Sequence, residues 1–347
     1  MNDYPKDCWY VAATSGEVGS GLTARRMLDT SVVLFRLSDG SIAALEDRCA
    51  HRPYPLSAGH REGDLVVCGY HGCTYDATGQ CVRVPSQDNV PSGAHVRAFP
   101  AVERGLFVWV WIGTPGGERL RPPPPTPWLE GDGWRSVGER RTVAANLLLL
   151  HEHYLDLTNV MAMHPEMVPP GIEALPPLEE VEVSEVSVSY RREFPQARLA
   201  PWEAQVSGLD SAEAFDRTET GAFLTAGLHK QTYTISGPDG PELELVRTHG
   251  FTPESSGATH VFLQISWRGA AASPDAGPQL AAVFHEMADR DIAVIETMQR
   301  CIDEDPTPRR YFNVKADRAA IRARRILTSM VADERGGRIS ERRDDRD

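Results

Sequence analysis

The chain has 347 residues, of which 41% are hydrophobic, and this predicts two domains or one large one with a proper core. Its net charge of −13 argues against nucleic acid as the main partner. No run of about 20 apolar residues occurs, and none follows Met1, so we expect neither a membrane span nor a signal peptide. These features together predict a cytoplasmic protein.

The first third of the chain is predicted to be an all-β domain. Short β-branched or aromatic runs alternate with turn sequences, as antiparallel strands require. The runs are 31–37, 42–46, 65–68 and 106–112. The domain is predicted to cover 1–117, and the segment 113–127, with four consecutive prolines, is predicted to be an extended boundary.

Two Cys/His pairs lie within this domain. Cys49-Ala50-His51 is followed, after sixteen residues, by Cys68-Gly69-Tyr70-His71. Two thiolates and two imidazoles suit a [2Fe–2S] cluster in which the cysteines bind one iron and the histidines bind the other. Because imidazoles carry no negative charge, such a cluster has a higher potential than an all-cysteine one.

A structural zinc site is the alternative, since two cysteines and two histidines also bind zinc. A zinc finger, however, pairs cysteine with cysteine and histidine with histidine, whereas each half here holds one of each. The iron–sulfur interpretation is therefore favoured. The other cysteines are predicted to be ordinary thiols of a reducing compartment, namely Cys8, Cys73, Cys81 and Cys301.

With the cluster motif, the segments Cys8-Trp9-Tyr10-Val11-Ala12 and Arg322-Ala323-Arg324-Arg325-Ile326-Leu327 complete a family pattern. The chain resembles the oxygenase (alpha) component of Rieske non-haem iron oxygenases, in particular the vanillate and dicamba O-demethylase group. The resemblance implies a terminal monooxygenase with a [2Fe–2S] cluster and a mononuclear Fe(II). It would take electrons from a separate NAD(P)H reductase or ferredoxin, and would use O2 to hydroxylate or O-/N-demethylate a small aromatic substrate.

The stretch 143–163 opens as a buried helix, and the family places two iron-binding histidines there. His164 matches the second, but Asn159 stands at the position of the first. Asparagine is a weaker Fe(II) ligand than imidazole. Three outcomes are open: Asn159 ligates poorly, His153 or His151 replaces it, or the site is weak or empty.

His153 precedes His164 by eleven residues, about 16 Å along a continuous helix, so it could serve only if the helix breaks. Asp156 matches the family aspartate that links a cluster histidine, here His71, to the iron site of the next subunit. This match implies a homotrimer.

The range 128–347 is predicted to be the catalytic domain. Strand-like runs occupy 180–194, 231–235, 242–248 and 259–267, and 200–220 is predicted to be a loop. His229, His249 and His260 lie in this region as isolated residues, for which a structural or solvated role is expected. The predicted fold class is α+β, with a helix-grip-like antiparallel sheet and long helices.

Apolar residues at helical spacing predict a long helix over 278–302. Asp291 lies on or beside its apolar face and matches the family's carboxylate ligand. A last helix is predicted over 317–332, and the charged tail 333–347 is predicted to be disordered.

The main hypothesis is therefore a Rieske-type oxygenase with Cys49, His51, Cys68 and His71 on the cluster, and with His164 and Asp291 on the iron. The alternative is a Rieske protein whose iron site is weakened or empty because of Asn159. Such a protein would act as an electron carrier, a binding module or an inactive variant.

Overall fold

A computed structural model describes residues 4–156, 158–178, 181–238, 240–269, 275–307, 309 and 311–336. The chain divides into two compact units. The N-terminal unit holds 6–125 with 252–255, and the C-terminal unit holds the rest of the chain. The division after Pro125 falls inside the proline-rich segment.

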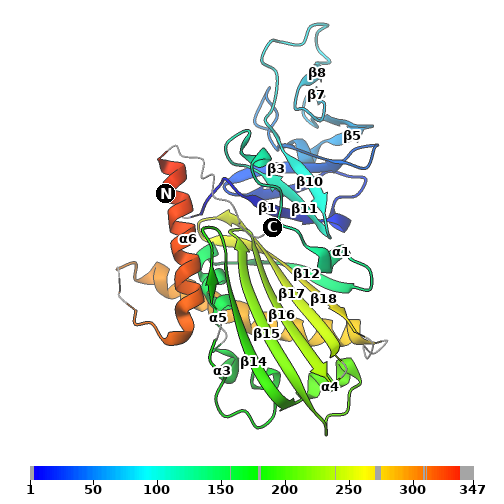
Figure 1. Ribbon diagram of the computed structural model, residues 1–347. Coiled ribbons are helices and arrows are strands. Elements are labelled where there is room, and N and C mark those ends of the chain that lie inside the picture. Colours follow the sequence, from blue (N-terminus) through cyan, green and yellow to red (C-terminus); the bar gives the residue numbers. More distant parts are fainter. Residues whose placement is uncertain are drawn as a thin grey trace. The chain divides into compact units, whose positions relative to one another are not determined.

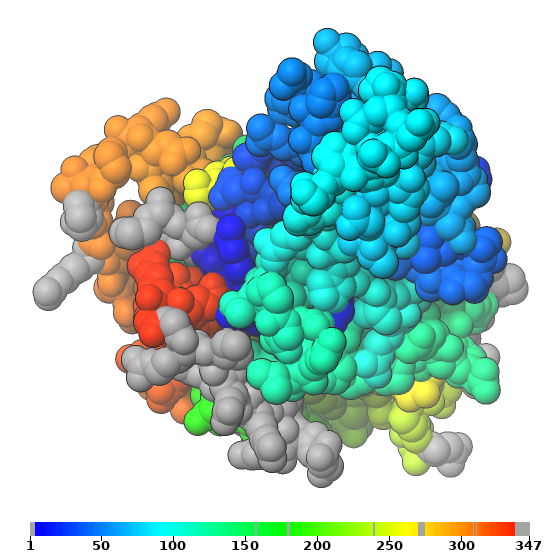
Figure 2. All heavy atoms as spheres, turned by 90° about the horizontal axis from the view of Figure 1, so that it is seen from above, coloured from blue at the N-terminus to red at the C-terminus, as the bar shows by residue number. Residues whose placement is uncertain are grey.

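The N-terminal unit consists of three small antiparallel sheets, whose atoms are drawn from blue to cyan in Figure 2. The first sheet has the order β1 (Trp9–Thr14), β11 (Phe107–Trp111) and β10 (Ala101–Arg104). The second has the order β2 (Thr23–Met27), β3 (Thr30–Arg36), β4 (Ile42–Glu46) and β9 (Ala98–Phe99). The third has the order β5 (His60–Glu62), β6 (Leu65–Val67), β7 (Thr74–Tyr75) and β8 (Cys81–Arg83). Short 3₁₀ turns lie at Ser15–Glu17, Leu56–Ala58 and Gly117–Arg119.

The C-terminal unit is built on a seven-stranded sheet (Figure 1). Its order is β12 (Arg135–Val143), β18 (Ala258–Arg268), β17 (Gly240–Ser255), β16 (Leu228–Gly237), β15 (Ala214–Thr225), β14 (Val188–Arg198) and β13 (Glu182–Val183). Buried and open positions alternate along the first half of β14, because side chains of a strand point to opposite faces.

Among the described residues, six helices accompany the sheet: α1 (Pro127–Glu130), α2 (Leu147–Leu155), α3 (Val160–Met163), α4 (Pro201–Ser207), α5 (Ala276–Glu304) and α6 (Arg318–Arg335). Short 3₁₀ turns lie at Pro165–Met167 and Lys315–Asp317. Helix α5 crosses the sheet (Figure 1) and buries a stripe three to four residues apart that includes Leu280, Phe284 and Met287. These side chains share one core with Leu245 and Trp267 of the sheet.

Two predicted elements were wrong. The helix expected from residue 143 begins only at Leu147, because Val143 is still paired with Thr259 in the sheet and the Asn146 side chain caps the helix by accepting from Leu149 N at 3.0 Å. The range 200–220, expected to be a loop, contains α4 and the start of β15. The proline at the first position of α4 and Glu203, which accepts from Ala200 N at 2.7 Å, explain why a helix starts there.

Helix α6 continues to Arg335, beyond the predicted end at 332, so the start of the predicted disordered tail is helical. The rest of that tail, 337–347, lies outside the described residues, as does Glu180 at the start of one predicted strand. No helix in the described ranges is both long and apolar enough to cross a bilayer.

Gly221 gives a test of the sheet packing. It lies directly opposite Tyr190, and a Cβ at this position would come within 2.1 Å of the tyrosine ring. We expect Gly221→Ala to reduce the free energy of unfolding by about 1–3 kcal/mol, since a packed core tolerates added volume poorly. The matched control is Gly257→Ala, where a Cβ meets no atom within 4 Å. Equal thermal midpoints for the two variants would contradict this packing.

Candidate metal centres

Two tight loops of the N-terminal unit carry the predicted cluster ligands. In the first, Cys49 N donates to Tyr54 O at 2.9 Å, and in the second, Cys68 N donates to Cys73 O at 2.9 Å. Gly72 closes the second loop with φ of +73°, and a Cβ there would lie 2.9 Å from the ring of Pro85. A side chain at this position would therefore strain the loop.

The loops separate the four side chains by burial. Cys49 and Cys68 are 5% and 2% exposed, whereas His51 and His71 are exposed and their ring centroids lie 4.6 Å apart. Two buried sulfurs beneath two adjacent outer imidazoles form a donor set that fits a binuclear cluster with one inner and one outer iron.

The surroundings of Cys49 favour its thiolate form. The Tyr75 hydroxyl lies 3.1 Å from its sulfur. Burial alone would raise the pKa of Cys49, but this contact and the backbone amides of His51 and Arg52 lower it. Burial raises the pKa of Cys73 to about 11, so Cys73 remains a neutral thiol at neutral pH. Burial likewise raises the pKa of Cys68, so these shifts do not separate the predicted ligands from Cys73.

The other cysteines, Cys8, Cys73, Cys81 and Cys301, form no disulfide in the structure, and of these four only Cys301 is exposed. Burial also raises the pKa of Cys81.

A second centre lies inside the C-terminal unit, where Asp291 of α5 is 1% exposed. Its Oδ1 lies 2.7 Å from His164 Nε2 and 3.0 Å from His153 Nε2. Burial alone would raise the pKa of Asp291, but the hydrogen bonds of His153 and His164 and the charges of His153 and Arg247 lower it well below its usual range. The carboxylate is therefore charged.

A break in the helix brings the two histidines together. Helix α2 ends at Leu155, and Asp156 Oδ1 accepts from Thr158 N at 2.9 Å and from Thr158 Oγ1 at 2.6 Å. Such a side-chain turn redirects the backbone. A new short helix, α3, then leads to His164, which lies 1% exposed against Asp291. The break therefore lets His153 and His164, which are eleven residues apart in the sequence, contact the same carboxylate.

These three side chains fit a mononuclear iron. Two imidazoles and one carboxylate form the facial triad of non-haem iron oxygenases. Ligand atoms at right angles around an ion about 2.1 Å away lie about 3 Å apart, close to the observed contacts. In the described ranges, no three such side chains are spaced around an open metal position. Here Asp291 instead contacts both imidazoles directly. His164 Nδ1 is buried without a hydrogen-bond partner, although Glu166 lies 4.0 Å away.

Asn159 does not join this group. It starts α3, where its backbone oxygen accepts from Met163 N at 2.8 Å, and its side chain makes no capping hydrogen bond. It lines a separate cavity of about 410 Å³ together with Phe194 and Arg217. His151, the other alternative, lies within 2.9 Å of the carbonyl oxygen of Ala226 instead.

The sequence did not reveal two buried histidines of the sheet as a pair. His229 and His249 are directly opposite each other on β16 and β17, and their Nδ1 atoms lie 3.2 Å apart. Burial lowers the pKa of both well below the usual value, so both rings are neutral and one donates to the other. This contact depends on the register between β16 and β17, which cannot be inferred from two isolated histidines in the sequence.

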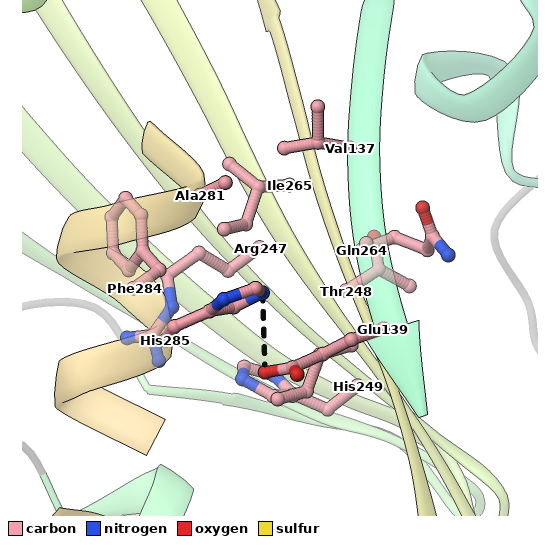
Figure 3. A pocket seen from close by; sticks show the side chains of 12 residues that line it. Val137, Glu139, Arg247, Thr248, His249, Gln264, Ile265, Ala281, Phe284 and His285 are labelled. Carbon is pink, nitrogen blue, oxygen red and sulfur yellow. Dashed lines mark ion pairs between the residues drawn. The ribbon is translucent and has the colours of Figure 1, made fainter. Parts of the chain in front are cut away.

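A cavity of about 350 Å³ lies between α5 and strands β12, β17 and β18 (Figure 3). Its wall is apolar where Val137, Ile265 and Phe284 contribute. Polar side chains enter it from the sheet, among them Arg247 and His249.

Known proteins resemble the chain along nearly its whole length. Dicamba monooxygenase bound to 3,6-dichlorosalicylic acid superimposes with a TM-score of 0.85 and 26% identity, over 95% of this chain and 98% of that chain. The vanillate O-demethylase oxygenase subunit of Pseudomonas sp. (strain HR199 / DSM 7063) is 25% identical over 95% of this chain and 96% of its own length.

A toluene-4-sulfonate monooxygenase iron-sulfur subunit of Comamonas testosteroni is 37% identical over 163 residues. This match spans 46% of each protein, so the chain matches about half the length of that relative.

Two family models match the chain. The Rieske [2Fe-2S] domain matches residues 8–100, and the vanillate O-demethylase oxygenase C-terminal domain matches residues 143–333, more than half of the chain. The predicted family, the α+β fold class and the two cofactors, a [2Fe–2S] cluster and a mononuclear iron, are confirmed. The chain belongs to the vanillate O-demethylase oxygenase family and carries a Rieske [2Fe–2S] domain ahead of its oxygenase domain.

Proposed function

We propose that this chain is the terminal oxygenase of a Rieske-type monooxygenase. It uses O2 to hydroxylate, or to O- or N-demethylate, a small aromatic substrate. The observation that carries the proposal is the contact of one buried carboxylate, Asp291, with the imidazoles of His153 and His164. A chain that also holds the Cys/His loops has both the electron store and the oxygen-activating centre that this reaction needs.

The cluster is held by Cys49, His51, Cys68 and His71. The mononuclear iron is held by His153, His164 and Asp291, and Asn159 is not a ligand. Iron bound there supplies the activation of O2. The side chains position the ligands and exclude water. Asp291 holds both imidazoles in place, and the apolar wall of the 350 Å³ cavity excludes water from the substrate.

Electrons come from a separate NAD(P)H reductase or ferredoxin, and the protein works in the cytoplasm. Six cysteines without a disulfide agree with a reducing compartment. Relatives of the chain are named for toluene-4-sulfonate, vanillate and dicamba, which are single-ring aromatics and agree with the proposed substrate class.

The first test is turnover. Purified protein with a ferredoxin–reductase pair, NADH and O2 should consume O2 when methoxybenzoates are added, and should release formaldehyde from those that it demethylates. Total iron should be about three per two acid-labile sulfides, by the ligand count of the two centres. Two irons per two sulfides, with no uptake for any aromatic, would instead identify an electron carrier or an inactive variant.

The second test concerns the iron ligands. We expect His153→Ala to bind Fe(II) at least about 100-fold more weakly at the mononuclear site, because even supporting residues of metal sites cost 10- to 100-fold when removed. Asn159→Ala is the matched variant and should keep one iron beyond the two of the cluster. Anaerobic Fe(II) titration, corrected by sulfide content, measures both. Iron retained in His153→Ala and lost in Asn159→Ala would reverse the assignment.

The third test concerns a subunit boundary. We propose a homotrimer in which Asp156 links His71 of one subunit to the iron site of the next. Only Oδ1 of Asp156 is used by the Thr158 turn, and an asparagine would preserve that acceptor. Asp156→Asn should therefore keep the cluster absorption and the iron content but lose about 100-fold in turnover.

Subunit mixing sharpens this test. A trimer that combines Asp156→Asn subunits with His71→Ala subunits pairs an intact cluster with an intact bridge across some boundaries. Turnover restored by mixing two inactive proteins supports transfer between subunits. Mixed trimers as inactive as their parents would contradict it.

A further inference from the structure

A groove of about 520 Å³ lies on the surface of the C-terminal unit, between the edge strand β13 and helix α6. One wall is aliphatic and the other is basic. The residues that line it are Val181, Val183, Ile321, Arg318, Arg322 and Arg325. Because side chains alternate along a strand, Glu182 points away from the side of Val181 and Val183, and it does not line the groove.

The three arginines of the groove form one face of α6. Arg318, Arg322 and Arg325 are four and three residues apart, so their side chains lie on the same side of the helix. All three are exposed, and none has an ion pair among the described residues. Arg324 lies on another side and pairs with Glu152 of α2. The groove thus adds three positive charges to the surface of a chain whose net charge is −13.

Two large aromatic side chains lie close to this face along the chain. Tyr311 is 76% exposed and Phe312 is 90% exposed, in the irregular segment between α5 and α6, six and seven residues before Arg318 (Figure 1). Single exposed apolar residues are common, but adjacent exposed aromatics near arginines are typical of protein interfaces, where both residue types are enriched. The surface therefore fits a protein partner better than a small anion.

Helix α6 packs beside the proposed subunit boundary. The ion pair between Arg324 and Glu152 joins α6 to α2, and Asp156 follows at the end of α2. In the proposed trimer, Asp156 meets the cluster ligand His71 of the neighbouring subunit. A protein bound to the basic face of α6 would therefore lie about one helix away from a cluster that it could reduce.

We propose that an acidic electron-carrier protein docks on the surface formed by Tyr311, Phe312, Arg318, Arg322 and Arg325. A strongly acidic protein is repelled by a chain of charge −13 as a whole and attracted by these arginines, so charge favours this place of contact. The reduced iron–sulfur centre of the carrier loses one electron, and the cluster of the oxygenase gains it. This inference rests on the proposed function, because it names the surface through which the same oxygenase receives its electrons.

Binding between the oxidised proteins tests this inference without turnover. The probe is a strongly acidic [2Fe–2S] ferredoxin, titrated calorimetrically into the intact oxygenase without NADH and without an aromatic compound. We expect binding at about 0.05 M NaCl and much weaker binding at about 0.5 M, because salt screens exposed charges. The same ferredoxin with its surface carboxylates amidated should not bind.

The variant Arg318→Gln/Arg322→Gln should bind the ferredoxin about 5- to 30-fold more weakly at low salt, the range that two exposed ion pairs provide. The charge-matched control is Arg135→Gln/Arg198→Gln, which should keep the affinity. Arg135 is exposed on β12, at the opposite edge of the sheet from β13, and Arg198 is exposed at the far end of β14.

Turnover gives a second measurement. In Arg318→Gln/Arg322→Gln the KM for ferredoxin should rise, while kcat at saturating ferredoxin and the cluster absorption should stay unchanged. Phe312→Ser should also weaken binding, but its affinity should fall with salt as steeply as that of the wild type, because no charge is removed. All these positions are exposed, so equal thermal midpoints are expected.

Three results would overturn the inference. In the first, the arginine variant binds ferredoxin as tightly as its charge-matched control. In the second, the wild type does not bind the acidic ferredoxin at low salt. In the third, the arginine variant sediments as a smaller assembly, which would assign the groove to a second copy of the chain. Substrate-dependent O2 uptake together with any of these would leave the oxygenase function standing, whereas ferredoxin binding without turnover of any aromatic would do the reverse.

Discussion

The C-terminal unit depends on the hydrogen bonds between one buried carboxylate and two imidazoles. Asp291 lies on the apolar stripe of α5, where an isolated charge would be costly. His164 and His153 relieve that cost at 2.7 and 3.0 Å. Because His153 lies in α2 and His164 directly follows α3, the two short helices must both approach α5 at the same point. The contact therefore fixes where the chain after β12 lies on this face of the unit.

Local patterns allowed much of this arrangement to be predicted. The cluster loops are turns in which each cysteine and its histidine lie two or three residues apart, so spacing alone placed them together. Helical periodicity and the family motif indicated Asp291 and His164. The central strands β16, β17 and β18 followed from strand-like runs between turn residues, whereas β12 and β15 were not predicted and both ends of β14 differed from the prediction.

The interactions that could not be predicted from the sequence are those between residues that only the tertiary structure brings together. His153 was only one alternative, because a continuous helix separates it from His164 by about 16 Å. The sequence Asp156-Leu157-Thr158 does hold a turn signal, a carboxylate two residues before a hydroxyl, which could have indicated the break. The contact between His229 and His249, by contrast, follows from the pairing of two strands that no local pattern fixes.

One helical turn joins the proposed metal ligand to a buried polar network of the sheet. His153 contacts Asp291, and the next residue, Tyr154, holds Gln231 through its backbone oxygen. Gln231 in turn accepts from Arg247. The imidazole that contacts Asp291 and the guanidinium that lines the cavity are therefore linked through one turn of α2 and one amide.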